Sequence, residues 1–172
     1  MKVSIVGTGY VGLVTGATLA DLGNQVVCLD IAEEKINILN SGKSPIYEPG
    51  LDKLIQQGLK AKNLKGSTEI KQNIRNSDIT FICVGTPSDK EGNIDLSYIK
   101  SASSEIGRAL RDKDGTHTVI VKSTVIPLTT EEVVMPNILK KSGWKREKLG
   151  IGMNPEFQER EMPFMMLRIL TG

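Results

Sequence analysis

The sequence predicts an α/β fold built on a doubly wound, mostly parallel sheet of six strands in a Rossmann-like arrangement. Short apolar runs alternate with helical patterns along the chain, and polar turn segments follow several of these runs. A length of 172 residues fits one domain with a sizeable core and hardly two. We expect the strand order 3-2-1-4-5-6, with a ligand crevice between strands one and four, where the order reverses.

The first half of the chain begins with a buried strand at Val3–Val6, a helix at Tyr10–Leu22 and a second strand at Gln25–Asp30. A loop rich in proline and glycine then separates two further helical patterns. The elements expected in this region are a helix at Ala32–Asn40, a helix at Glu48–Leu59, a short strand at Gly66–Glu69 and a helix at Ile70–Asn76.

The second half opens with Ile79–Val84, an almost unbroken apolar run that is typical of a central parallel strand. Asp95 is a plausible N-cap for the helix that follows. The remaining expected elements are a helix at Leu96–Leu110, a strand at Thr118–Val121, a helix at Leu128–Lys141 and a strand at Gly150–Met153.

Three glycines close the first strand and open the first helix in a G-x-G-x-x-G pattern, Gly7, Gly9 and Gly12. Gly7 would permit the tight turn, Gly9 would let the backbone approach a pyrophosphate, and Gly12 would allow close helix–strand packing. Asp30 ends the second strand, where its carboxylate would accept hydrogen bonds from an adenosine ribose and would repel a 2′-phosphate. The pattern therefore predicts NAD binding rather than NADP binding. The alternative is a turn whose glycines serve packing only.

Three polar clusters come directly after predicted strands, namely Gly85-Thr86-Pro87, Lys122-Ser123-Thr124 and Asn154-Pro155-Glu156. In an open parallel sheet all three would line the crevice at the carboxyl edge. The hydroxyls of Thr86 and Thr124 could hold a nicotinamide ribose or a water, and Glu156 could act as a base or orient water. Each cluster alone could also be an ordinary turn.

Composition argues against several other classes of function. A net charge of +2 with both signs interspersed indicates no nucleic-acid arm, and no apolar run approaches the roughly 20 residues that span a bilayer. We expect Cys28 and Cys83 to be buried thiols in strands, as is usual in a cytoplasmic protein. His117 has no neighbouring Cys or His, so we expect no metal site.

Five segments together resemble the N-terminal NAD-binding domain of the UDP-glucose 6-dehydrogenase family, within the wider group of nucleotide-sugar dehydrogenases. They are MKVSIVGTGYVGLVTG, LDIAEEKINILNSGKSPIYEPGL, FICVGTPSDKEGNIDLSYI, VKSTV and MNPEF, which cover Met1–Phe157. The resemblance implies oxidation of a sugar C6 alcohol to a carboxylate through an enzyme thioester, with two NAD reduced. UDP-N-acetylmannosamine and GDP-mannose dehydrogenases share this layout, but the loop sequences look closer to the UDP-glucose branch.

The resemblance also implies roles for individual residues. Thr124 and Glu156 would be catalytic, the first by positioning a water and the second by assisting proton transfer. Glu156 and Phe157 would contact the sugar nucleotide. The residues implied to bind NAD are Gly7, Gly9, Tyr10, Val11, Gly12, Asp30, Lys35, Gly85, Thr86 and Thr124. From the residues alone, Lys35 could equally be a solvated helix lysine.

The chain departs from the family pattern near its end. We expect an NAD-binding domain at residues 1–157 and an atypical tail at 158–172, in which residues 158–167 would fit a pair of compensating frameshifts. Leu128 stands where relatives commonly have glycine. The domain that carries the family's nucleophilic cysteine and most of its UDP site is absent, so the chain alone should not oxidise UDP-glucose. A separately encoded C-terminal half is a candidate partner. The alternatives are a non-catalytic NAD-binding module and a remnant of a related UDP-N-acetylmannosamine or GDP-mannose dehydrogenase.

Overall fold

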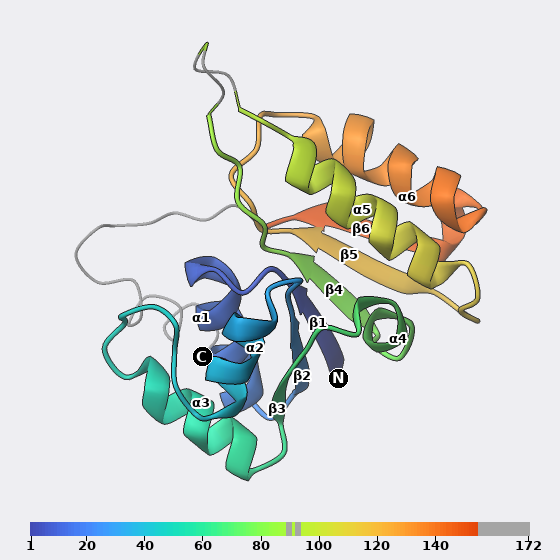
Figure 1. The fold of residues 1–172 in the computed structure, drawn as a ribbon. Coiled ribbons are helices and arrows are strands. Elements are labelled where there is room, and N and C mark those ends of the chain that lie inside the picture. Colours follow the sequence, from blue (N-terminus) through green and yellow to red (C-terminus); the bar gives the residue numbers. More distant parts are fainter. Residues whose placement is uncertain (89–90, 92–93, 155–172) are drawn as a thin grey trace.

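The computed structural model describes residues 1–88, 91 and 94–154. Its sheet contains six parallel strands in the order β3-β2-β1-β4-β5-β6, which confirms the predicted order. The strands are β1 (Lys2–Val6), β2 (Gln25–Leu29), β3 (Leu64–Ser67), β4 (Ile79–Ile82), β5 (His117–Val121) and β6 (Leu149–Met153). The order reverses between β1 and β4, as predicted (Figure 1).

Helices cover both faces of the sheet, and each face has its own apolar core. The helices are α1 (Tyr10–Asp21), α2 (Glu33–Asn40), α3 (Leu51–Lys60), α4 (Ile70–Arg75), α5 (Ser97–Leu110) and α6 (Met135–Ser142). Along β2, Val26 and Cys28 pack with α1 and α3, whereas Val27 and Leu29 belong to the core beneath α4, α5 and α6. This alternation follows from the period of two in a strand, and it explains why the apolar runs are nearly continuous.

Several element boundaries differ from the sequence prediction. Helix α3 begins at Leu51 rather than at Glu48, because Gly50 adopts a left-handed conformation with φ of 86°. The third strand spans Leu64–Ser67 rather than Gly66–Glu69, and it pairs with β2. These shifts reflect local backbone geometry that apolar periodicity does not encode.

The helix predicted at Leu128–Lys141 forms without a break, but its first part is a π-helix. A π-helix, η1 (Thr130–Val134), precedes α6, which starts at Met135. Leu128 lies outside both, with a left-handed φ of 69°, and its carbonyl accepts hydrogen bonds from the amides of Glu131 and Glu132. The segment therefore turns at Leu128 before the helix begins.

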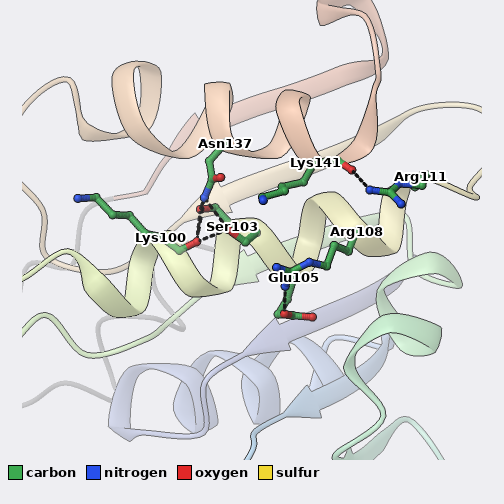
Figure 2. Close-up of polar contacts among 8 residues, drawn as sticks. Lys100, Ser103, Glu105, Arg108, Arg111, Asn137 and Lys141 are labelled. Carbon is green, nitrogen blue, oxygen red and sulfur yellow. Dashed lines mark hydrogen bonds and ion pairs between the residues drawn. The ribbon is translucent and has the colours of Figure 1, made fainter.

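Helices α5 and α6 pack side by side over β4, β5 and β6 (Figure 1). Asn137 of α6 donates its side-chain amide to the carbonyl of Lys100 and to the Ser103 hydroxyl, both at 2.8 Å (Figure 2). At the other end, Arg111 donates to the carbonyl of Lys141 at 3.2 Å. These contacts hold α5 and α6 against each other. At the carboxyl edge of the sheet the strands lead into loops. Among the described residues, no helix has the length and apolar character needed to cross a membrane.

Candidate cofactor site

The turn after β1 is tight, and two of its glycines are required by the fold itself. Gly7 has a φ of 101°, and a Cβ atom there would lie 2.6 Å from the carbonyl oxygen of Cys83. A Cβ atom on Gly12 would lie 1.9 Å from the carbonyl oxygen of Gly7. Both separations are far below van der Waals contact, so the turn can pass this close to the end of β4 only with glycine at both positions.

Gly9 is different, because nothing among the described residues requires a glycine there. Its φ of −74° suits any residue, and apart from its chain neighbours no atom of the described residues lies within 4 Å of the position that a Cβ would take. Gly9 is also the N-cap of α1, and no described side chain caps this helix or places an acid in its first turn. Open space thus lies at the positive end of a helix that has no such side-chain cap, which is where a phosphate group fits.

Asp30 lies directly after β2 and is tied to the glycine turn. Its Oδ2 atom accepts hydrogen bonds from the backbone N–H and the hydroxyl of Thr8, at 2.9 and 2.6 Å. Its Oδ1 atom accepts the backbone N–H of Ala32 at 3.0 Å, and Lys35 Nζ lies 3.8 Å from Oδ2. Burial alone would raise the pKa of Asp30, but the hydrogen bonds from Thr8 and Ala32, together with the Lys35 charge, hold this pKa below its usual value. The side chain is therefore a carboxylate at neutral pH.

Tyr10 links the start of α1 to the loop that precedes α3. Its hydroxyl donates to the Oε2 atom of Glu48 at 3.0 Å. Tyr47, the neighbouring residue, is 92% exposed. The Y-E-P-G segment thus contacts the start of α1 through Glu48, while Tyr47 is exposed to solvent.

Hydrogen bonds from two side-chain hydroxyl groups link the loops after β4 and β5. Thr86 Oγ1 donates to the carbonyl of Thr124 at 2.8 Å, and Ser123 Oγ donates to the carbonyl of Val84 at 2.6 Å. Because the Thr86 hydroxyl is the donor in this bond, only its oxygen lone pairs remain, and these can accept a hydrogen bond from a ligand. Gly85 and Thr124 are exposed beside it.

A buried lysine joins the end of β5 to the residue that follows β6. Lys122 is 6% exposed, and its Nζ atom donates to Asn154 Oδ1 at 3.1 Å. The backbone N–H of Asn154 also donates to the carbonyl of Val121 at 3.0 Å. All three predicted clusters therefore meet at one edge of the sheet, as far as Asn154. The predicted residues Glu156 and Phe157 lie outside the described residues.

The cysteines have the buried positions that the sequence predicts. Both side chains are buried, and burial raises the pKa of Cys28 to about 12, so Cys28 carries no thiolate at neutral pH. Within residues 1–88, 91 and 94–154, no three His, Cys, Asp or Glu side chains lie close enough together to hold a metal ion.

Two contributors to the site were not predicted from the sequence. Thr8 occupies a variable position of the glycine motif, and Glu48 was interpreted only as the start of a helix and as part of a family segment. Ser123 was predicted as part of its cluster, but its bond to Val84 was not. A hydroxyl next to a turn glycine and opposite an acid was the one signal that could have pointed to Thr8.

The geometry fits a dinucleotide. Space for a diphosphate lies at Gly9, and a carboxylate for a ribose lies one strand away at Asp30. Acceptors for the second half lie across the switch point at Thr86.

Comparison with known proteins gives the same result. The sequence profile described as "UDP-glucose/GDP-mannose dehydrogenase family, NAD binding domain" matches residues 1–165. GDP-mannose 6-dehydrogenase from Pseudomonas aeruginosa is 49% identical over 158 residues, which are 91% of this chain and 36% of that protein. UDP-glucose 6-dehydrogenase AglM from Haloferax volcanii is 43% identical over 159 residues, again 91% of this chain and 36% of that protein.

Solved structures agree with these sequence matches. A ternary complex of GDP-mannose dehydrogenase from Pseudomonas aeruginosa superposes with a TM-score of 0.94 and 46% identity, covering 97% of this chain and 38% of that one. A UDP-glucose dehydrogenase from the archaeon Pyrobaculum islandicum gives a TM-score of 0.90 and 35% identity, covering 96% and 38%. The chain thus spans little more than a third of the length of these relatives. It belongs to the UDP-glucose/GDP-mannose dehydrogenase family and corresponds to the NAD-binding domain of that family.

Proposed function

We propose that this chain supplies the NAD site of a nucleotide-sugar 6-dehydrogenase that converts UDP-glucose to UDP-glucuronate and reduces two NAD, and that it is inactive without the rest of that enzyme. One observation supports the cofactor part most directly. The space at Gly9 lies at the N-terminus of α1, where no described side chain forms a cap, although the described residues leave room for a side chain at this position.

The adenosine diphosphate half would bind along the first turn. Gly7, Gly9 and Gly12 bring the backbone close to the diphosphate, with the amides of Tyr10 and Val11 at the helix N-terminus. Asp30 would accept hydrogen bonds from the ribose hydroxyls, and the Lys35 ammonium group would lie next to the same sugar. A negatively charged Asp30 would also repel the 2′-phosphate of NADP.

The nicotinamide half would bind where the loops after β4 and β5 meet. When bound, NAD supplies the hydride acceptor for oxidation of the alcohol. Gly85 leaves room for the sugar, and Thr86 can accept a hydrogen bond from it while holding Thr124 in place. Thr124, with an exposed side chain, would position the water used in hydrolysis of the thioester. Glu156 would assist proton transfer, and Phe157 would contact the sugar nucleotide.

The substrate is a choice between two sugar nucleotides. The loop segments favour UDP-glucose, whereas the comparisons include GDP-mannose 6-dehydrogenases at up to 49% identity and UDP-glucose 6-dehydrogenases at 43% and 42%. UDP-glucose remains our proposal, and GDP-mannose is the candidate to test beside it.

Turnover would need groups that the described residues do not contribute. Cys28 is buried and protonated at neutral pH, so it cannot serve as the thioester nucleophile. We propose that a C-terminal half, encoded separately or as part of a longer chain, provides the nucleophile and most of the sugar site. We propose a cytoplasmic location, which agrees with the burial of both cysteines.

Two measurements test this proposal. Calorimetric titration of the chain with NAD should show binding to one site, and no binding would refute the cofactor role. Mixing with a separately expressed C-terminal half of a UDP-glucose or a GDP-mannose dehydrogenase, each with its own substrate, should yield NADH by absorbance. Binding of NAD without NADH from either mixture, when both halves are folded, would favour a non-catalytic NAD-binding module.

A further inference from the structure

Thr8 and Asp30 make a closed pair of hydrogen bonds beneath the cofactor site. The backbone N–H and the hydroxyl of Thr8 both donate to the same carboxylate oxygen, Oδ2, at 2.9 and 2.6 Å. Thr8 is only 1% exposed, so these bonds are shielded from water. One strand end further, Gly7 donates its N–H to the carbonyl of Leu29 at 2.8 Å.

The two oxygens of the Asp30 carboxylate have different partners. Oδ2 is occupied by Thr8 and faces Lys35. Oδ1 accepts the amide of Ala32 at 3.0 Å, and a carboxylate oxygen has room for a second donor. Oδ1 is thus the atom best able to accept a ribose hydroxyl.

We propose that Thr8 is a positioning residue that sets the preference for NAD over NADP, because it anchors Oδ2 of Asp30 and so directs Oδ1 toward the ribose. This inference rests on the proposed NAD site and deepens it. Thr8 itself would not touch the ribose.

The other partner of Asp30 cannot do the same. Lys35 lies 3.8 Å from Oδ2, and its side chain is 47% exposed, so the pair is loose and screened by solvent. The hydrogen bond from the Thr8 hydroxyl is short and buried, and its acceptor is a charged carboxylate. It therefore constrains the Asp30 side chain more strongly than Lys35 does. Because the carboxylate is already held in place before the ligand binds, less conformational entropy is lost on binding.

The test uses calorimetric titration of the chain with NAD and with NADP. Thr8→Val keeps the shape and removes the hydroxyl, and Thr8→Ser keeps the hydroxyl. Thr8→Val should weaken NAD binding by about tenfold and change NADP binding little, so that the ratio of the two affinities falls. Thr8→Ser should restore most of both. Thr18→Val is the matched control, since Thr18 is also a buried threonine, in the second half of α1, and its hydroxyl has no partner among the described residues.

A double-mutant cycle separates positioning from a general structural effect. In an Asp30→Ala background, which removes the acceptor of both Thr8 bonds, Thr8→Val should lower NAD affinity by less than about twofold, since its loss acts through the carboxylate. Thermal unfolding of each variant checks that the domain is folded. If Thr8→Val binds NAD as wild type does, or loses as much affinity with Asp30→Ala as without it, the inference is wrong. Failure of wild type to bind NAD would instead refute the proposed function.

Discussion

The Thr86 hydroxyl donates its proton to the carbonyl of Thr124 at 2.8 Å, which joins the loops after β4 and β5 on the nicotinamide side of the switch point. The two residues were predicted separately as contacts for the cofactor. Their bond means that Thr86 can offer a ligand only acceptor lone pairs, and that Thr124 depends on Thr86 for its backbone position.

Thr86→Val should therefore weaken the nicotinamide half of the site and leave the adenosine half intact. We expect NAD affinity to fall by roughly three- to tenfold, in line with the loss of one hydrogen bond, and ADP affinity to stay unchanged. Parallel calorimetric titrations with NAD and ADP make the comparison. An equal loss for both ligands would contradict the assignment of Thr86 to the nicotinamide side.

Gly9→Ala should mainly weaken NAD binding, whereas Gly12→Ala should mainly destabilise the fold. A Cβ at Gly9 meets no atom of the described residues within 4 Å, and alanine is a poorer N-cap than glycine but lowers the entropy of the unfolded chain, so the stability of Gly9→Ala should stay within about 1 kcal/mol of wild type. Its NAD affinity should nevertheless fall by about tenfold or more, since the methyl group would occupy the phosphate space. A Cβ at Gly12 would lie 1.9 Å from Gly7 O, so Gly12→Ala should lose stability by roughly 1–3 kcal/mol. Urea unfolding and NAD titration of both variants test this. Wild-type NAD affinity in Gly9→Ala would exclude a phosphate at that place.

Leu128→Gly should stabilise the domain. Leu128 has a left-handed φ of 69° and is 59% exposed, so glycine would relieve strain and lose little packing. Left-handed geometry costs a non-glycine residue roughly 1–2 kcal/mol, and the larger unfolded-state entropy of glycine offsets part of the gain, so we expect about 1 kcal/mol. The urea midpoint measures it. Ile126→Gly, at an exposed neighbour without a positive φ, is the control and should not stabilise.

His117 should make the domain less stable in mild acid. It is 1% exposed and lies 2.8 Å from Thr80 Oγ1, and burial, aided by the Lys113 charge, lowers the pKa of His117 to about 4. The unfolded chain would bind this proton near pH 6.5 and the folded chain only near pH 4, so stability should fall between these values by up to about 3 kcal/mol.

Urea unfolding from pH 7 to pH 4 tests this titration. His117→Gln should flatten the decline in that range. Asp30 contributes in a separate window, because its pKa is lowered, and the stability it confers is lost only as pH falls below its ordinary value of 3.8. A decline as steep in His117→Gln as in wild type would show that another group is responsible.

Much of the fold and part of the site were predictable because they depend on patterns that repeat. The strand order follows from alternating apolar runs and crossover rules, and Asp30 follows from its offset from the glycines. The start of α3 was missed because it depends on a left-handed turn at Gly50, which is local geometry.

Thr8 could not be identified from the sequence for a different reason. Its role depends on the meeting of two strand ends that are 22 residues apart in the chain, and the motif leaves its position variable. The left-handed turn at Leu128 was not predicted, since periodicity favoured a helix that begins at this residue. The resemblance indicated only that relatives commonly have glycine there.

The central claim concerns the carboxylate that ends β2, and one titration tests it most directly. Calorimetry of wild type and Asp30→Ala with NAD and with NADP should show that wild type prefers NAD, and that the variant loses NAD affinity and most of its preference. Equal affinity of wild type for the two cofactors, or an unchanged preference in Asp30→Ala, would contradict the account.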